Sequence, residues 1–182
     1  MRVITGSARG MVLRTLEGND VRPTTDKVKE AVFSAIQFEI EGRRILDLFA
    51  GSGQLGIEAL SRGAESAVFV DADKNAVKII KENLAKTKLD SLASVAQTDS
   101  IAFLTMTDKI FDIAFIDPPY GVGLLQKALS KISDNIAEGG MVICEHPFKE
   151  ELEDLAISYL DPVAYHEIEE NLDEALTEVI ER

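Results

Sequence analysis

The sequence predicts an α/β fold in which a mostly parallel sheet carries helices on both faces. Short apolar runs alternate with amphipathic stretches from residue 44 onward, which is typical of right-handed βαβ units. A glycine-rich turn directly follows the first of these runs. The length of 182 residues, with 46% hydrophobic composition, suits one domain with a full core. Strands are expected at residues 45–49, 67–70, 93–97, 113–116 and 141–145.

The N-terminal segment predicts a β-hairpin followed by a helix. Two short runs, 2–5 and 11–14, flank the glycine-containing residues 6–10. Residues 23–26 (Pro-Thr-Thr-Asp) then offer N-cap chemistry. The helix that follows would present one apolar face, made of Val28, Ala31, Val32, Ala35 and Ile36. We therefore divide the chain into an N-terminal arm, residues 1–20, and a main domain, residues 21–182.

The later elements follow from the same patterns. Helices are expected at residues 73–84 and 124–136, between the predicted strands. Two more apolar runs, 163–168 and 176–180, read as strands and can form an antiparallel hairpin at one edge of the sheet.

The charge of the chain is unevenly distributed. The formal net charge is −13, whereas binding to nucleic-acid phosphates needs Lys and Arg. Residues 1–44 carry 8 basic and 6 acidic side chains, and residues 145–182 carry 2 basic and 13 acidic ones. The one positive stretch is therefore at the N-terminus, where a local patch can still hold RNA.

Several protein classes are excluded or disfavoured by composition. The single cysteine, Cys144, excludes a disulfide framework and is expected to be a buried strand thiol. His146 and His166 belong to no paired metal-ligand pattern, so we expect no metal. No apolar run approaches the roughly 18 residues needed to span a bilayer, and the N-terminus lacks the pattern of a signal peptide. We expect a cytoplasmic protein that is a monomer.

The turn after the first strand predicts a cofactor site. Gly51, Gly53 and Gly56 satisfy the G-x-G-x-x-G pattern, which by itself favours NAD. Asp47 indicates a different ligand, because a carboxylate beside the turn repels a pyrophosphate. The same carboxylate attracts the ammonium group of S-adenosylmethionine. Asp71, at the end of the second strand, can accept hydrogen bonds from both hydroxyls of a ribose.

An acidic residue also closes the third strand. Asp99 can accept a hydrogen bond from an adenine amino group, whereas Asp73 is favoured as a helix N-cap. Open α/β sheets bind ligands at the carboxyl ends of their strands, so these acids are expected to face one site. The residues predicted from this region to bind the cofactor are Asp47, Phe49, Gly51, Ser52, Gly53, Gly56, Asp71, Asp99 and Ser100.

The fourth strand ends in a candidate catalytic motif, Asp117-Pro118-Pro119-Tyr120. The prolines stiffen the loop and remove two N–H donors, which leaves acceptors in excess. The Asp117 carboxylate and the Pro118 carbonyl can accept the two hydrogens of an aromatic amine, while Tyr120 stacks on the base. Such positioning would direct the nitrogen lone pair at the methyl group of the cofactor. A base in structured RNA would have to leave its stack to reach this site.

At these residues the sequence resembles the bacterial methyltransferases that modify N2 of a guanine in 16S ribosomal RNA. The resemblance runs from the N-terminus to about Glu145, roughly four-fifths of the chain. Asp-Pro-Pro-Tyr is shared with many amino-methyltransferases, and the Arg-Pro-Thr-Thr-Asp stretch is much more selective. The matching segments are residues 2–6, 22–33, 47–53 and 117–120.

The resemblance implies a Rossmann-like class I S-adenosylmethionine-dependent methyltransferase with a seven-stranded sheet and a reversed last strand. It implies that the N-terminal hairpin helps grip RNA, through Arg2, Arg9 and Arg14. It also implies that residues 22–29 lie over the cofactor and the target base. On this ground Arg22 and Thr24 are assigned to the cofactor and Lys29 to RNA.

One departure from the family pattern concerns the C-terminus. Residues 169–177, where the family tends to have basic and glycine positions, are here acidic or bulky, so this edge is not expected to touch phosphate. The expected partner is ribosomal RNA in an assembling small subunit, where ribosomal proteins could supply the missing contacts.

Three alternatives remain from the residues. A DNA adenine-N6 methyltransferase could use the same Asp117–Tyr120 chemistry, although no separate target-recognition domain fits in the chain. A non-catalytic binding or assembly module is disfavoured by the intact motif. An NAD-dependent oxidoreductase is disfavoured by Asp47 and by the lack of an evident hydride-transfer residue.

Overall fold

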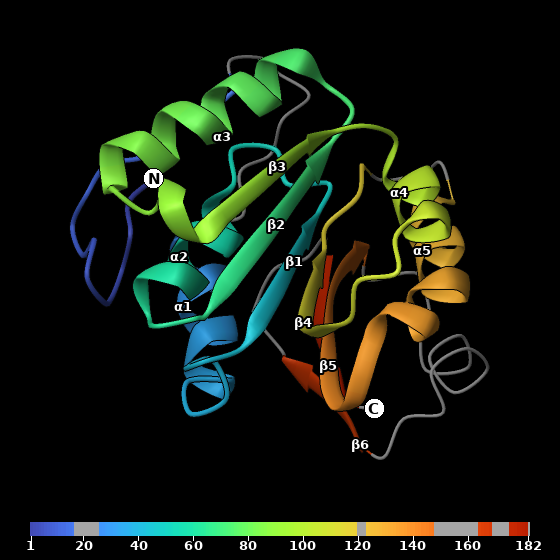
Figure 1. Cartoon of the computed structure of the whole chain (residues 1–182). Coiled ribbons are helices and arrows are strands. Elements are labelled where there is room, and N and C mark those ends of the chain that lie inside the picture. Colours follow the sequence, from blue (N-terminus) through green and yellow to red (C-terminus); the bar gives the residue numbers. More distant parts are fainter. Residues whose placement is uncertain (17–25, 120–122, 148–163, 169–174, 182) are drawn as a thin grey trace.

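The computed structural model describes residues 1–16, 26–119, 123–147, 164–168 and 175–181. Within them, seven strands form one sheet in the order β3-β2-β1-β4-β5-β7-β6 (Figure 1). Strands β1 to β5 run parallel, and β7 is antiparallel to both of its neighbours. This confirms the predicted fold, including the edge hairpin. The strands are β1 (Arg44–Leu48), β2 (Ser66–Asp71), β3 (Ala93–Gln97), β4 (Phe111–Ile116), β5 (Ile136–Pro147), β6 (Ala164–Ile168) and β7 (Ala175–Glu181).

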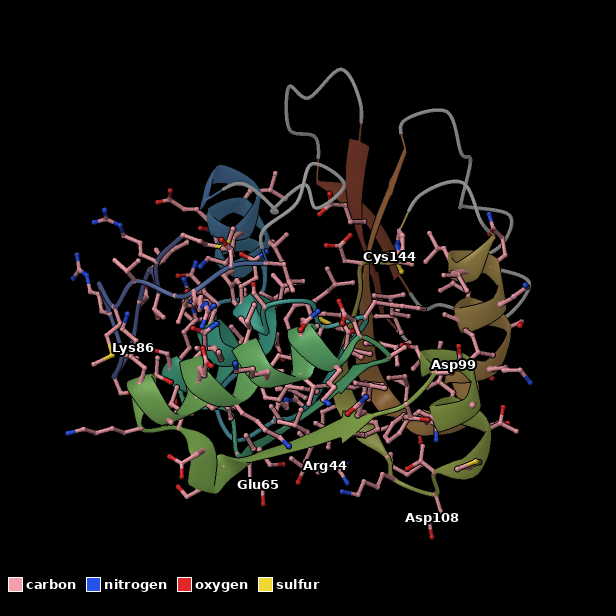
Figure 2. All side chains as sticks on the ribbon, turned by 90° about the horizontal axis from the view of Figure 1, so that it is seen from above. Arg44, Glu65, Lys86, Asp99, Asp108 and Cys144 are labelled. Carbon is pink, nitrogen blue, oxygen red and sulfur yellow. The ribbon has the colours of Figure 1, made fainter. Side chains whose placement is uncertain are left out.

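Helices cover both faces of the sheet, and alternating strand residues build two cores. In β4, Ile113 and Phe115 join the cluster that includes α1, α2 and α3, whereas Ala114 and Ile116 join the cluster with α4 and α5. This alternation follows from the two-residue period of a strand that is buried on both faces. Figure 2 shows side chains packed on either side of the ribbon of the sheet. The helices are α1 (Asp26–Ala35), α2 (Gln54–Ser61), α3 (Lys74–Thr87), α4 (Ser100–Met106) and α5 (Leu124–Ile132), with 3-10 helices η1 (Asp90–Leu92) and η2 (Ser133–Asn135).

The fifth strand is longer than predicted, and the helix before it is shorter. Helix α5 ends at Ile132, and η2 leads directly into β5. The Asn135 side chain turns the chain here, because its Nδ2 donates to the carbonyls of Thr107 and Lys109, each at 3.2 Å. Ile136 then pairs with Phe111 in the ladder. The two carbonyls are 28 and 26 residues away from Asn135 in sequence, so the helical periodicity of the sequence predicted too long a helix.

The N-terminal arm forms a turn with less strand pairing than a full hairpin. It has one antiparallel bridge, Arg2 to Val12, and a hydrogen bond from Val3 N to the carbonyl oxygen of Met11 at 2.9 Å. Val3 and Leu13 are buried in the core with α1 and α2. Figure 2 shows Lys86 of α3 beside the arm, and its ammonium donates to the Val12 carbonyl at 2.6 Å. The arm is therefore packed onto the main domain.

The order of the strands creates the place for a site. From β1 the chain goes outward to β2 and β3, and then returns to β4 on the other side of β1. Loops leaving β1 and β4 therefore diverge, and such a switch point is where open α/β sheets bind ligands. No helix in the described ranges is both long and apolar enough to cross a bilayer.

Candidate active site

A cavity of about 730 Å³ lies at the carboxyl ends of β1 to β5. Its described lining contains five carboxylate residues and neither Lys nor Arg. It therefore suits a ligand that carries positive charge and hydrogen-bond donors. The lining residues are Thr15, Leu16, Phe49, Ala50, Gly51, Ser52, Gln54, Asp71, Ala72, Asp73, Asp99, Ser100, Asp117, Pro118, Pro119, Leu124 and Glu145.

The glycine-rich loop after β1 forms the floor of the cavity. Gly51 and Gly53 have φ of 54° and 76°, in the left-handed region that glycine adopts without strain. Phe49 also lies there, with φ of 62°, which is unusual for a residue with a bulky side chain. Asp71 holds the loop in place, because its Oδ2 accepts a hydrogen bond from Gly51 N at 2.8 Å. Asp71 is therefore both a loop anchor and a wall of the cavity.

Asp47 lies beneath this loop and does not line the cavity. Only 3% of the residue is exposed, and its Oδ2 accepts a hydrogen bond from Gly56 N at 2.9 Å. Burial raises the pKa of Asp47 to about 7, the Gly56 N–H opposes this, and the charge of Asp71 adds to it. A side chain on Gly56 would clash with the Phe69 ring and approach Asp47, so this glycine serves helix–strand packing. Gly53 and Gly56 are likewise absent from the lining.

The acids after β2 and β3 also begin helices. Asp73 is the N-cap of α3 and accepts from Asn75 N at 2.8 Å, which confirms its predicted cap role. Asp99 is the N-cap of α4 and accepts from Ala102 N at 2.8 Å through Oδ1. Asp99 nevertheless lines the cavity together with Ser100. Capping and facing a ligand are compatible, since an ionised carboxylate has about four acceptor sites.

At the other end of the cavity, Asp117 and Glu145 follow equivalent positions of adjacent strands. Ile116 of β4 pairs with Cys144 of β5 in parallel register, and Asp117 and Glu145 come next. Both line the cavity with Pro118, which is buried, and Pro119, which is exposed. Glu145 was missed in the sequence, although it follows the fifth apolar run as Asp117 follows the fourth.

The arm also contributes to the cavity, which the sequence did not reveal. Thr15 and Leu16 line it. Asn83 of α3, only 1% exposed, fixes the preceding residue: its Oδ1 accepts from Arg14 N at 2.8 Å and its Nδ2 donates to the Arg14 carbonyl at 2.9 Å. The same Nδ2 donates to the carbonyl of Ser52 at 2.9 Å. One side chain thus ties the arm to the glycine-rich loop.

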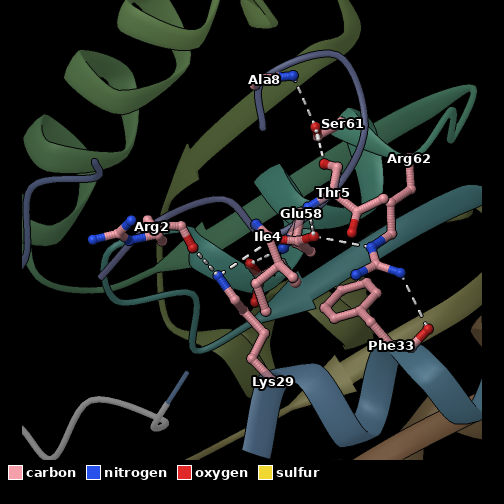
Figure 3. A network of polar contacts seen from close by, with 11 residues as sticks. Arg2, Ile4, Thr5, Ala8, Lys29, Phe33, Glu58, Ser61 and Arg62 are labelled. Atoms are coloured by element: carbon pink, nitrogen blue, oxygen red, sulfur yellow. Dashed lines mark hydrogen bonds and ion pairs between the residues drawn. The ribbon is translucent and has the colours of Figure 1, made fainter. Parts of the chain in front are cut away.

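The structure corrects the assignment of Lys29 to RNA. Its side chain is fully buried, its ammonium lies 3.3 Å from a Glu58 carboxylate oxygen, and it donates to the Arg2 carbonyl at 2.6 Å (Figure 3). Glu58 also accepts hydrogen bonds from Ile4 N and Thr5 N of the arm. A buried charge requires such pairing. Lys29 therefore fastens the arm to α1 and α2 and cannot contact a phosphate.

The remaining predicted residues fall into two groups. Arg2, Arg9 and Arg14 are exposed on the arm, and Arg14 forms an ion pair with Glu82 at 2.6 Å. Three others lie outside the described residues: Arg22, Thr24 and Tyr120.

Known proteins resemble this chain over most of its length. The family model described as Conserved hypothetical protein 95 matches residues 1–172. "Putative rRNA methyltransferase YlbH" of Bacillus subtilis is 43% identical over 157 residues, which cover 84% of this chain and 85% of that protein. "Ribosomal RNA small subunit methyltransferase D" of Escherichia coli K12 is 35% identical over 147 residues, covering 80% and 74%.

A solved structure of another methyltransferase-named protein also resembles this chain over its whole length. "Putative methyltransferase yhhF from Escherichia coli" superposes with a TM-score of 0.83 and 29% identity, and the match covers 100% of this chain and 97% of that one. Sequence and structure agree with the resemblance that the motifs indicated. The chain therefore belongs to the Conserved hypothetical protein 95 family, and to the same family as the ribosomal RNA small subunit methyltransferase D proteins.

Proposed function

We propose that this protein transfers a methyl group from S-adenosylmethionine to the exocyclic N2 of a guanine in small-subunit ribosomal RNA. The observation that carries the proposal is the cavity, which joins a glycine-rich loop and acidic strand ends to the Asp117-Pro118-Pro119 turn. Relatives that cover most of the chain are named for methyl transfer to ribosomal RNA.

The charge of the cavity favours this cofactor over NAD. S-adenosylmethionine carries a sulfonium, an ammonium and a carboxylate, so its net charge is positive, whereas NAD carries a pyrophosphate. A lining with five carboxylates and no Lys or Arg among the described residues attracts the first and repels the second. Asp71 and Asp99 follow the neighbouring strands β2 and β3, so they lie side by side at the cavity. We assign Asp71 to the ribose of the cofactor and Asp99 to its adenine.

The chemistry needs accurate positioning and no covalent intermediate. The bound cofactor supplies an activated methyl group on its sulfur. The Asp117 carboxylate and the Pro118 carbonyl would each accept one hydrogen of the target amine, which leaves the nitrogen lone pair directed at the methyl carbon. As the new N–C bond replaces the S–C bond of the cofactor, Asp117 would take the proton that the nitrogen loses. Holding two reactants in this way can supply much of the rate acceleration.

Glu145 supports guanine over adenine as the target base. Among the four RNA bases, only guanine has an amino group next to a ring N–H, whereas the amines of adenine and cytosine adjoin a ring acceptor. With the amine at Asp117, Glu145 on the neighbouring strand can accept the N1–H of guanine. The same carboxylate would repel the ring acceptor of adenine. This argues against the DNA adenine-N6 alternative.

We assign RNA binding to the N-terminal arm. Arg2, Arg9 and Arg14 are exposed there, whereas the net charge of −13 gives no long-range attraction to RNA. We therefore propose that the substrate is a partly assembled small subunit in the cytoplasm, where ribosomal proteins add contacts.

Methyl transfer with labelled S-adenosylmethionine tests the proposal. Small-subunit particles and protein-free ribosomal RNA from cells lacking this gene are incubated with the protein and digested to nucleosides. We expect N2-methylguanosine, with more of it from the particles. Formation of N6-methyladenosine instead, or calorimetry showing that NAD binds and S-adenosylmethionine does not, would overturn the proposal.

A further inference from the structure

Gln54 lines the cavity and carries a side-chain acceptor without a partner among the described residues. It is the first residue of α2, it lines the cavity, and 8% of it is exposed. Its Oε1 is buried and has no hydrogen-bond partner among the described residues. An unpaired buried acceptor costs free energy, and the large majority of such atoms have partners. Because this oxygen is buried, the side chain has to turn toward the cavity before a bound ligand can supply the missing donor.

The position of Gln54 along the cavity indicates which part of a ligand it meets. The strand ends follow in the order β3, β2, β1, β4, which places Asp99, then Asp71, then the loop after β1, then Asp117. An adenosine spanning the first two leaves the amino-acid part of S-adenosylmethionine beside the loop after β1. Gln54 ends that loop.

The start of α2 offers complementary groups for a zwitterion. Its N-cap is Gly53, which has no side chain to cap the helix. The first N–H groups of a helix have no intrahelical acceptor, and Gly56 N donates to Asp47. The N-terminus of α2 can therefore face a carboxylate, which the helix dipole favours. The Gln54 oxygen provides the acceptor that an ammonium group needs.

We infer that Gln54 is a positioning residue for the cofactor: its Oε1 accepts a hydrogen bond from the α-ammonium group of S-adenosylmethionine. It takes the role that the sequence suggested for Asp47, which is buried beneath the loop and absent from the lining. The assignment rests on the proposed function for the identity of the cofactor. It is independent of the RNA target.

Calorimetry with two ligands isolates this contact. S-adenosylhomocysteine has the amino-acid group, and 5′-methylthioadenosine has the same adenosine and thioether without it. We expect Gln54→Leu to weaken S-adenosylhomocysteine binding about tenfold or more, the range for losing a hydrogen bond to a charged group. Binding of methylthioadenosine should change less than about twofold, since it lacks the ammonium.

Two further variants separate recognition from structure. Gln54→Glu keeps an acceptor, so it should bind S-adenosylhomocysteine better than Gln54→Leu does; a merely structural role predicts the reverse, because a buried carboxylate costs more than a leucine. Gln126→Leu is a matched control: Gln126 Oε1 is also buried without a partner, but Gln126 does not line the cavity. It should leave both affinities unchanged.

The outcomes are distinct. Unchanged S-adenosylhomocysteine affinity in Gln54→Leu, or equal losses for both ligands, would overturn the role of Gln54 while leaving the proposed function intact. Failure of the wild-type protein to bind S-adenosylhomocysteine or S-adenosylmethionine would overturn both.

Discussion

Asp47 of β1 accepts a hydrogen bond from the backbone N–H of Gly56 at 2.9 Å, and this contact joins the central strand to the first turn of α2. The carboxyl group is almost completely buried, and burial raises its pKa to about 7. The sequence assigned this acid to a ligand. The structure places it under the loop that the ligand would contact, where it also affects stability.

The first prediction concerns the pH dependence of stability. The unfolded chain has an aspartate pKa of about 3.9, so the folded protein binds a proton at Asp47 at a higher pH than the unfolded chain. The stabilisation from this proton is complete below about pH 4 and is lost as the pH rises to about 7. Asp47→Asn carries no titrating group there. Between pH 5 and pH 8 the wild type should lose roughly 2–3 kcal/mol more unfolding free energy than the variant.

Urea unfolding of both proteins at the two pH values measures this difference. Asp90→Asn, an exposed aspartate in η1, provides the matched control and should follow the wild type. A wild type and an Asp47→Asn variant with parallel pH dependence would show that Asp47 is ionised in the folded protein.

The second prediction concerns Asp117. Asp117→Ala should abolish methyl transfer, because the target amine loses the acceptor that orients it, while S-adenosylmethionine affinity changes little. Assays on small-subunit particles give the methyl-transfer rate, and calorimetry on the same protein preparations gives the S-adenosylmethionine affinity. Asp108→Ala, which removes an exposed aspartate that does not line the cavity, should change neither. Full turnover in Asp117→Ala would remove Asp117 from the mechanism.

The third prediction concerns the choice of base at Glu145. In Glu145→Gln, the amide nitrogen can donate to a ring acceptor that the carboxylate rejects. The measurement compares the binding affinities of guanosine and 2-aminopurine riboside for protein saturated with S-adenosylhomocysteine. The second nucleoside keeps the amine but lacks the N1–H. The preference for guanosine should fall about tenfold, within the 1–3 kcal/mol of one base contact. Methylation of guanine in small-subunit particles should fall by a similar factor.

Two variants control this comparison. Glu145→Asp keeps a carboxylate and should keep the preference for guanosine, and Glu138→Gln changes an exposed glutamate of the same strand outside the cavity lining. Equal losses for the two nucleosides in Glu145→Gln, or an unchanged rate on particles, would leave Glu145 without a role in base choice.

The fourth prediction concerns the arm. Replacing Arg9 and Arg14 together by glutamine should reduce RNA methylation and leave cofactor affinity unchanged. The logarithm of the RNA-binding constant falls linearly with the logarithm of the salt concentration, and each lost phosphate contact makes this slope shallower by about one unit. The slope of the double variant should therefore be shallower by about two units. Lys127→Gln with Lys131→Gln on α5 makes the same change in net charge on the opposite face of the sheet. If both double variants bind RNA with the wild-type slope, the arm does not hold phosphate.

Much of the fold could be predicted from the sequence, because the patterns that define its strands lie in residues adjacent along the chain. The parallel strands β1 to β4 were predicted to within two residues at each end, since buried strands give continuous apolar runs between turn residues. The start of β5 was missed because Asn135 is fixed by carbonyls that are 28 and 26 residues away in sequence. The arm pairs with less regularity than the apolar pattern suggested, since its contacts with α2 and α3 replace part of the ladder.

The sequence by itself determined the α/β class, the glycine-rich turn, the acids that close successive strands and the Asp117-Pro118-Pro119 turn. Each of these depends on residues adjacent in the chain. Only the tertiary structure decided which polar groups share the cavity, because burial and pairing depend on residues that are distant in sequence. It buried Lys29 against Glu58, and it moved Asp47 beneath the loop. It brought Gln54 and Glu145 into the cavity wall, where their chemistry can act on a ligand.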